Sequence, residues 1–333
     1  MALPVKELLF FLKMLENNKI TELESTALSI IRVFAMVLIV LCHIAQCYDL
    51  QAAWLLNVGV QIFFFMSGFL YGKLNLPSSP FAFYKKRLVK LYFPYIIWVT
   101  LIVCVYAVFN LYKPNKWQLV LYFFNLQWFS TPIDGLNHLW FLTVLMVGYL
   151  MTPWVKRIHE RYPLFCILAF VICCVIEFVI IKKFYSFFAW VALYFAGMLY
   201  GAYNSKKLSN VVLLVTGVFL IVMGMLFKMD WLNRIEYRYH NIWLHWALGL
   251  FLFALFYRII PLIIKSDKEN VALKHLDQIS YEVYLTHHPL ILGPLSMMFI
   301  TRYVLLNVLL MLMAVYALSR ALHYVNSFTN KLL

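Results

Sequence analysis

Residues 26–46 read TALSIIRVFAMVLIVLCHIAQ, an apolar run long enough to cross a bilayer that nevertheless contains Arg32 and His43. An arginine within a membrane helix costs about 2.5–3.5 kcal/mol by insertion scales, so its presence needs a reason. On an α-helix, the separation of eleven residues corresponds to about 16 Å along the axis and returns both side chains to nearly the same face. The stretch predicts a membrane helix that presents a cation at one depth and a proton acceptor at another. Alternatively, Arg32 extends to the headgroups and His43 hydrogen-bonds a neighbouring helix.

The composition of the whole chain indicates an integral membrane protein. Of its 333 residues, 64% are hydrophobic and 13% are charged, whereas an average soluble domain has about 25% charged residues. The net charge of +14 is carried by short segments between apolar runs, where basic residues set topology and face anionic lipid, which argues against nucleic-acid binding. The six cysteines form no CxxC pair, so neither a disulfide framework nor a bound metal is expected.

Ten apolar runs of about 20 residues predict an all-α bundle of about ten transmembrane helices, in a single membrane domain over residues 26–325. Residues 1–25 are expected to form a cytoplasmic segment, either a short interfacial helix or an unstructured tail, and residues 326–333 a cytoplasmic tail. Lysine and arginine concentrate in alternate loops, which predicts a multi-pass protein of the cell membrane with both termini in the cytoplasm. The runs lie at 26–46, 54–72, 88–110, 138–155, 163–181, 185–203, 210–228, 242–263, 279–300 and 303–325.

Polar residues interrupt the second and fourth runs. The second run contains Gln61, a polar side chain at membrane depth that needs a partner, and a small Ser-Gly pair that we interpret as a close-packing site. His138 and Trp140 begin the fourth run at the outer boundary, where they are either cavity residues or interfacial anchors. The external loop before them carries an apolar piece at 117–129 that is too short to span, which predicts a re-entrant or interfacial segment.

A basic cluster, Lys86, Arg87 and Lys90, enters the third run from the cytoplasmic side. The three residues lie within about one helical turn of each other. Such a group suits phosphate, since arginine offers a bidentate fork and lysine a point charge. Anchoring under the positive-inside rule explains most clusters of this kind, so the residues alone favour a role in topology.

The ninth run begins ISYEVYLTHHPL and carries the densest group of polar side chains in the chain. Ser280, Tyr284 and His287 follow the spacing of one helical face, whereas Glu282 and His288 lie on other faces. Exposure of these groups to lipid would be costly. They are therefore predicted to line an internal cavity.

Taken in order, these residues resemble the membrane-bound acyltransferase 3 family of sugar and glycan O-acyltransferases, from Arg32 to about Val325. One departure is Lys90, because the family usually has a second arginine there, and lysine keeps the charge but loses the bidentate geometry. The matching features are the Arg–His pair at 32 and 43, the aromatic run 59–69 ending in Ser-Gly-Phe, the basic pair before a proline at 87–94, His-Leu-Trp-Phe at 138–141 and the segment from Ser-Tyr to His at 280–287.

The resemblance implies transfer of an acyl group, commonly acetyl from acetyl-CoA, to a hydroxyl of a cell-surface or exported glycan. We expect Lys86, Arg87 and Lys90 to hold the CoA phosphates on the cytoplasmic side, with the pantetheine arm carrying the thioester inward along the first helix. His43, with Arg32 on the same helix, is then expected to act as general base on the acceptor hydroxyl, a role worth about 10²–10⁴-fold in rate. Direct transfer and a transient acyl-enzyme are both open.

The alternative is a membrane transporter or exporter of a glycan or small solute, because polar residues on several helices could line a transport path. The chain shows neither a repeat of half-chains nor matched broken helices, which argues against this class. A purely structural or sensing protein leaves the Arg32–His43 pair unexplained. Binding of CoA separates the two main hypotheses, since a transporter has no reason to bind it.

Overall fold

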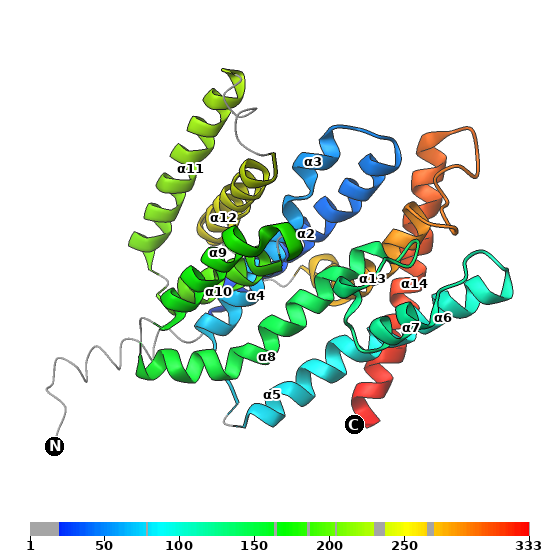
Figure 1. Cartoon of the computed structure of the whole chain (residues 1–333), viewed down its shortest axis with the longest axis horizontal. Helices are drawn as coiled ribbons and strands as arrows, with labels where there is room; N and C mark the ends of the chain where they lie inside the picture. Colours follow the sequence, from blue (N-terminus) through cyan, green and yellow to red (C-terminus); the bar gives the residue numbers. More distant parts are fainter. Residues whose placement is uncertain are drawn as a thin grey trace, which may run out of the picture. The chain divides into compact units, whose positions relative to one another are not determined.

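The computed structural model describes residues 20–77, 79–162, 165–184, 187–203, 205–229, 237–264 and 270–332, and every regular element within these ranges is a helix (Figure 1). The all-α class is thus confirmed for the described residues. Seven helices in them are long and apolar enough to cross a membrane, so a multi-pass membrane protein is confirmed, whereas the count of ten is not. The interfacial helix predicted near the N-terminus lies, up to residue 19, outside the described residues.

The chain forms two compact units that interleave along the sequence. Unit 1 contains the residues up to Arg32, Val60–Pro77 and Met151–Asn270, and unit 2 contains Val33–Gly59, Ser78–Leu150 and the residues from Val271 onward. Two helices are divided between the units, α2 (Glu22–Cys47) and α8 (Trp140–Arg161), and α4 (Val58–Lys73) contributes its first two residues to unit 2. The other helices assigned mainly to unit 1 are α4, α9 (Phe165–Phe184), α10 (Phe187–Ala202), α11 (Lys206–Lys228) and α12 (Tyr237–Ile263). Those of unit 2 are α3 (Ala52–Leu56), α5 (Pro80–Arg87), η1 (Leu88–Tyr92), α6 (Phe93–Val108), α7 (Lys116–Phe123), η2 (Gln127–Phe129), η3 (Asn137–Leu139), α13 (Val271–Ile291) and α14 (Val304–Leu332).

In unit 1, α4 and α10 pack backbone to backbone. A Cβ atom added at Gly68 would overlap the carbonyl of Tyr194, and one at Gly197 would overlap the carbonyl of Phe65. Small residues at such positions let membrane helices approach closely enough for van der Waals packing to hold them together. The Ser-Gly pair of the second apolar run therefore serves helix packing, as predicted.

A buried ion pair also stabilises unit 1. The ammonium group of Lys73, at the end of α4, lies 2.5 Å from a carboxylate oxygen of Glu24 and 3.0 Å from the hydroxyl oxygen of Tyr257. The Tyr257 hydroxyl donates to the same carboxylate oxygen at 2.6 Å. The charge of Lys73 is thus compensated inside the protein, as a buried charge requires.

In unit 2, α6, α13 and α14 pack against one another, and η1 packs against α14 (Figure 1). The segment η1 is a π-helical turn that joins α5 to α6, so the basic cluster of the third run lies where the helical repeat changes. In the segment between α6 and α8, α7 is a helix of 8 residues that begins with a capping box between Asn115 and Gln118. At about 1.5 Å per residue it is too short to cross a bilayer, as predicted for this piece.

Several predicted bounds differ from those of the helices. The ninth run predicts a helix over 279–300, whereas the helix there, α13, covers Val271–Ile291. The beginning of α13 is not apolar, because its first two turns carry Lys274, His275 and Asp277, so a search for apolar runs starts too late. A helix can carry such residues where it extends beyond the apolar core. The helix α13 ends at Ile291 because Gly293 and Pro294 follow, a pair that does not continue a helix.

Candidate active site

Four imidazoles from three separate segments of unit 2 pack into one group, which we term the histidine cluster: His43 of α2, His138 of η3, and His287 and His288 of α13. The His43 ring centroid lies 5.2 Å from that of His287 and 4.6 Å from that of His288. The His138 ring stacks on His288 at 4.6 Å, with an interplanar angle of 12°, and lies 5.1 Å from His287. Three of these residues were predicted as catalytic or cavity residues, and the structure brings them together.

Hydrogen bonds determine which ring nitrogen carries the proton in three of the four imidazoles. His43 Nδ1 lies 2.7 Å from Oε1 of Gln46, and His288 Nδ1 lies 2.9 Å from the carbonyl oxygen of Gly135. His287 Nδ1 bonds at 3.0 Å to a carbonyl one turn earlier in α13. Because amide and carbonyl oxygens only accept, each Nδ1 is the donor and each Nε2 keeps a lone pair. The cluster thus offers proton acceptors, and Nε2 of His287 has no hydrogen-bond partner among the described residues.

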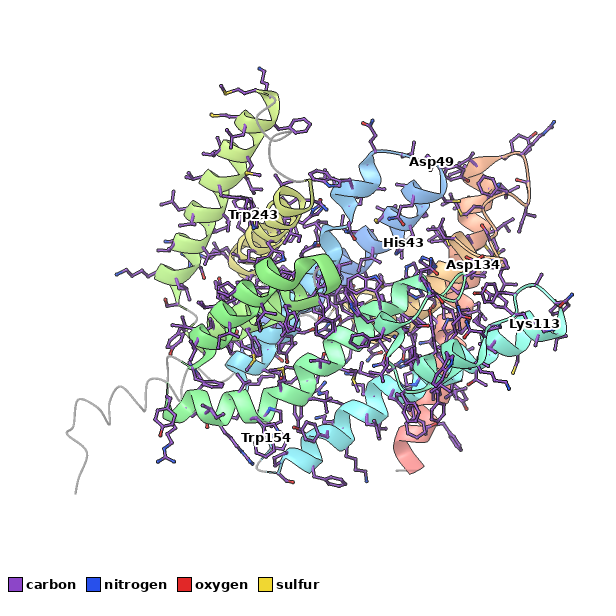
Figure 2. The ribbon with its side chains drawn as sticks, in the orientation of Figure 1. His43, Asp49, Lys113, Asp134, Trp154 and Trp243 are labelled. Atoms are coloured by element: carbon purple, nitrogen blue, oxygen red, sulfur yellow. The ribbon has the colours of Figure 1, made fainter. Side chains whose placement is uncertain are left out.

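The loop before α8 closes one side of the histidine cluster. Gly135 has φ of 76°, a conformation that favours glycine, and a Cβ atom there would come within 2.5 Å of the Tyr106 hydroxyl. That hydroxyl donates to the carbonyl of Asp134 at 2.9 Å. The Cα of Gly135 also lies against Gly293, just after α13. Figure 2 shows His43 and Asp134 close together, in agreement with the contacts that His288 makes to both segments.

Tyr122 of α7 also holds this loop in place. Its hydroxyl accepts from the backbone N–H of Ile133 at 3.0 Å and donates to the carbonyl of Leu136 at 3.4 Å. Burial raises the pKa of Tyr122 to about 12, so the hydroxyl remains a donor at physiological pH. The position of the Gly135 carbonyl is therefore fixed on both sides.

Two tyrosines of α13 connect the histidine cluster with η1. Tyr284 lies 5.1 Å from the His138 ring and donates its hydroxyl hydrogen to the His138 carbonyl at 2.6 Å. Tyr281 stacks on Tyr284, with ring centroids 6.4 Å apart, and donates to the carbonyl of Leu91 in η1 at 2.7 Å. The cavity role predicted for Tyr284 stays a prediction, but its ring adjoins the cluster.

A pocket of about 590 Å³ opens beside Tyr281, between α5 with η1 on one side and α13 with α14 on the other. We term it the lysine pocket, because three lysines line one wall. The opposite wall carries polar side chains. Its lining residues are Ala82, Lys85, Lys86, Val89, Lys90, Gln278, Tyr281, Glu282, His323, Asn326 and Ser327.

The structure divides the predicted basic cluster. Lys86 and Lys90 line the lysine pocket, together with Lys85. The Arg87 guanidinium instead lies 5.6 Å from the ring of Phe83 and 5.9 Å from that of Tyr149, which is cation–π geometry. A role for Arg87 in phosphate binding stays a prediction.

The remaining predicted site residues are Trp140, Ser280, Arg32 and Gln61. Trp140 packs on Trp128 at 5.3 Å, and the Ser280 hydroxyl donates to the Asp277 carbonyl at 2.7 Å within its own helix. Arg32 and Gln61 belong to unit 1, where Gln61 is buried against α12. The site roles of these four side chains stay predictions.

Sequence reasoning missed three groups that shape the site. Gln46 lies three residues after His43 on the same helical face, a spacing that could have indicated their hydrogen bond. His288 was placed on another face, and the Gly135 carbonyl that holds it carries no sequence signal beyond the glycine itself. No set of three or more His, Cys, Asp or Glu side chains in the described residues is arranged to hold a metal.

A buried group of proton acceptors beside a cationic pocket, within a helical membrane protein, is a site suited to group transfer from an anionic donor. The chain matches the family described as acyltransferase domain, the acyltransferase 3 family, over residues 25–323. It belongs to this family and is a membrane acyltransferase, as the resemblance implied. No curated protein and no solved structure matches the chain significantly.

Proposed function

We propose that the protein transfers an acyl group, commonly acetyl, from cytoplasmic acyl-CoA to a hydroxyl of a cell-surface or exported glycan. The observation that supports this is the course of α13. This one helix contributes Tyr281 and Glu282 to the wall of the lysine pocket, and His287 and His288 to the histidine cluster. Five residues of α-helix, from Glu282 to His287, span only about 7.5 Å along the axis. A donor whose phosphates meet the lysines therefore has its thioester end within reach of the imidazoles.

His43 is the proposed general base. Its Nδ1 hydrogen is engaged by Gln46, so Nε2 is available to take the proton from the acceptor hydroxyl. The hydroxyl oxygen then attacks the thioester carbonyl, the new C–O bond forms, and the C–S bond breaks. The departing CoA thiolate takes the proton back from the imidazolium, so the enzyme ends the cycle unchanged. In this mechanism Gln46 is a positioning residue, because it orients the His43 ring. Arg32, earlier on α2, keeps the catalytic role proposed for it from the sequence.

The charge distribution of the loops motivates the proposed sidedness, in which both termini and the lysine pocket face the cytoplasm and the acceptor glycan lies outside. The test uses sealed vesicles of known orientation, loaded with glycan on the external face and given acetyl-CoA on either face. We expect thioester consumption only from the cytoplasmic face, with the acyl group appearing on the glycan at the other face.

Control variants identify the residues involved. Lys86→Gln combined with Lys90→Gln is expected to raise the KM for acetyl-CoA, whereas Lys207→Gln, at an exposed lysine of α11, is not. Reaction of both substrates from the cytoplasmic face would refute the transmembrane mechanism. Glycan movement across the membrane without CoA turnover would favour the transporter alternative instead.

A further inference from the structure

A buried carboxylate faces the lysine pocket from the opposite wall. The Glu282 side chain is 3% exposed, and one carboxylate oxygen lies 3.1 Å from Nδ1 of His323 on α14. Its other oxygen, Oε2, is itself buried and has no hydrogen-bond partner among the described residues. A carboxylate is costly to bury unless both oxygens are satisfied, so this residue of the pocket lining carries an unsatisfied acceptor.

The Glu282 carboxylate restricts which chemical groups can bind beside it. A carboxylate repels phosphate and accepts hydrogen bonds only from N–H or O–H groups. The lysines of the opposite wall attract phosphate. The pocket therefore suits a ligand with an anionic end and, further along, an uncharged segment that carries donors. An acyl-CoA has this order: phosphates, then a pantetheine arm with two amide N–H groups and a hydroxyl.

Acyl-CoA carries N–H donors both in its pantetheine arm and on the amino group of its adenine. The position of Glu282 along the helices favours the pantetheine arm as its partner. Tyr281 bonds to the carbonyl of Leu91, so Glu282 lies at about the level of Lys90. Lys85 and Lys86 lie about one turn nearer the beginning of α5, and His287 lies about 7.5 Å further along α13. Glu282 thus lies between Lys85 and Lys86 on one side and the histidine cluster on the other, where the arm must pass.

We propose that Glu282 is a specificity-determining residue for the acyl donor, and that its Oε2 accepts a hydrogen bond from a pantetheine N–H or O–H group while His323 holds the carboxylate in place. This inference rests on the proposed function, because it assumes that an acyl-CoA enters the lysine pocket. It goes beyond that function by assigning recognition of the arm, and not only of the phosphates, to a residue that has no role in the proposed reaction.

The test compares two ligands on the full-length protein in detergent micelles: CoA, and adenosine 3′,5′-bisphosphate, which lacks the pantetheine arm. Affinities are measured by isothermal titration calorimetry. Glu282→Gln turns one acceptor into a donor and is expected to weaken CoA binding about tenfold, since hydrogen bonds to charged groups contribute about 1.5–3 kcal/mol. Binding of the bisphosphate is expected to stay within about twofold of the unaltered protein.

Three further variants separate this result from general damage. Lys86→Gln is expected to weaken both ligands, and Glu160→Gln, the same change at an exposed glutamate of α8, neither. Glu282→Asp keeps the charge but withdraws the carboxylate, so it is expected to weaken CoA alone, and it serves if the Gln variant does not fold.

Equal weakening of both ligands by the Glu282 variants, or no effect on either, would overturn the assignment. Absence of CoA binding to the unaltered protein would overturn the proposed function together with it.

Discussion

Replacing Gly135 with alanine tests how the histidine cluster is held in place. The residue has φ of 76°, and an alanine in this conformation costs about 1–2 kcal/mol. The added Cβ would also displace the Tyr106 hydroxyl, which lies 2.5 Å from that position, and break its hydrogen bond to Asp134, worth about 1 kcal/mol. Together these terms predict a loss of about 2–3 kcal/mol in the free energy of unfolding.

The matched control is Gly224→Ala in α11, where a Cβ atom would meet nothing within 4 Å. In a helix interior this change is expected to stabilise by about 0.5–1 kcal/mol. Both variants are unfolded in mixed micelles with increasing denaturing detergent, and acyl transfer is measured below the transition. Gly135→Ala is also expected to lower activity, because it moves the carbonyl that binds His288. Equal stability of the two variants would refute the reasoning.

Three further predictions concern single side chains. His43→Ala is expected to abolish acyl transfer at an unchanged level of folded protein in the membrane, and near-normal glycan acylation would disprove its role as base. Gln46→Leu is expected to lower kcat about 2- to 10-fold with little change in the KM for acyl-CoA. Gln46→Glu restores an acceptor for His43 and is expected to recover most of the lost kcat. A change in KM alone would point to a different role. Lys73→Met is expected to destabilise the protein by about 3–5 kcal/mol in the same unfolding assay, because it leaves the Glu24 carboxylate uncompensated, and adding Glu24→Gln should restore part of the loss; full stability of the single variant would contradict the importance of the pair.

The fold was predictable where apolar composition decides it. Each predicted run overlaps a helix, and the short apolar piece at 117–129 forms α7 and η2 rather than a span. The errors arise where composition is uninformative. Polar first turns concealed the beginning of α13, and nothing in the sequence marks the π-helical turn η1. The expected single membrane domain over 26–325 stays a prediction.

The candidate site was predictable only in its individual members. Helical spacing grouped Ser280, Tyr284 and His287, but a short local bond satisfies Ser280, so it need not face the cluster. His288 was placed on another face than His287, because adjacent residues on a helix point about 100° apart. A carbonyl 153 residues earlier in the chain, that of Gly135, binds its ring, and such a long-range contact leaves no trace in local periodicity.

The assembly of the histidine cluster has a consequence for biosynthesis. Its members come from positions 43, 138 and 287–288, so a ribosome has made two of the four imidazoles long before the other two exist. The lysine pocket likewise needs residues of α14, which is translated later still. A nascent or prematurely terminated chain can thus insert its early helices without a complete histidine cluster or a complete lysine pocket. Competence for catalysis would arise in one late step, when the final pair of helices joins those already in the bilayer.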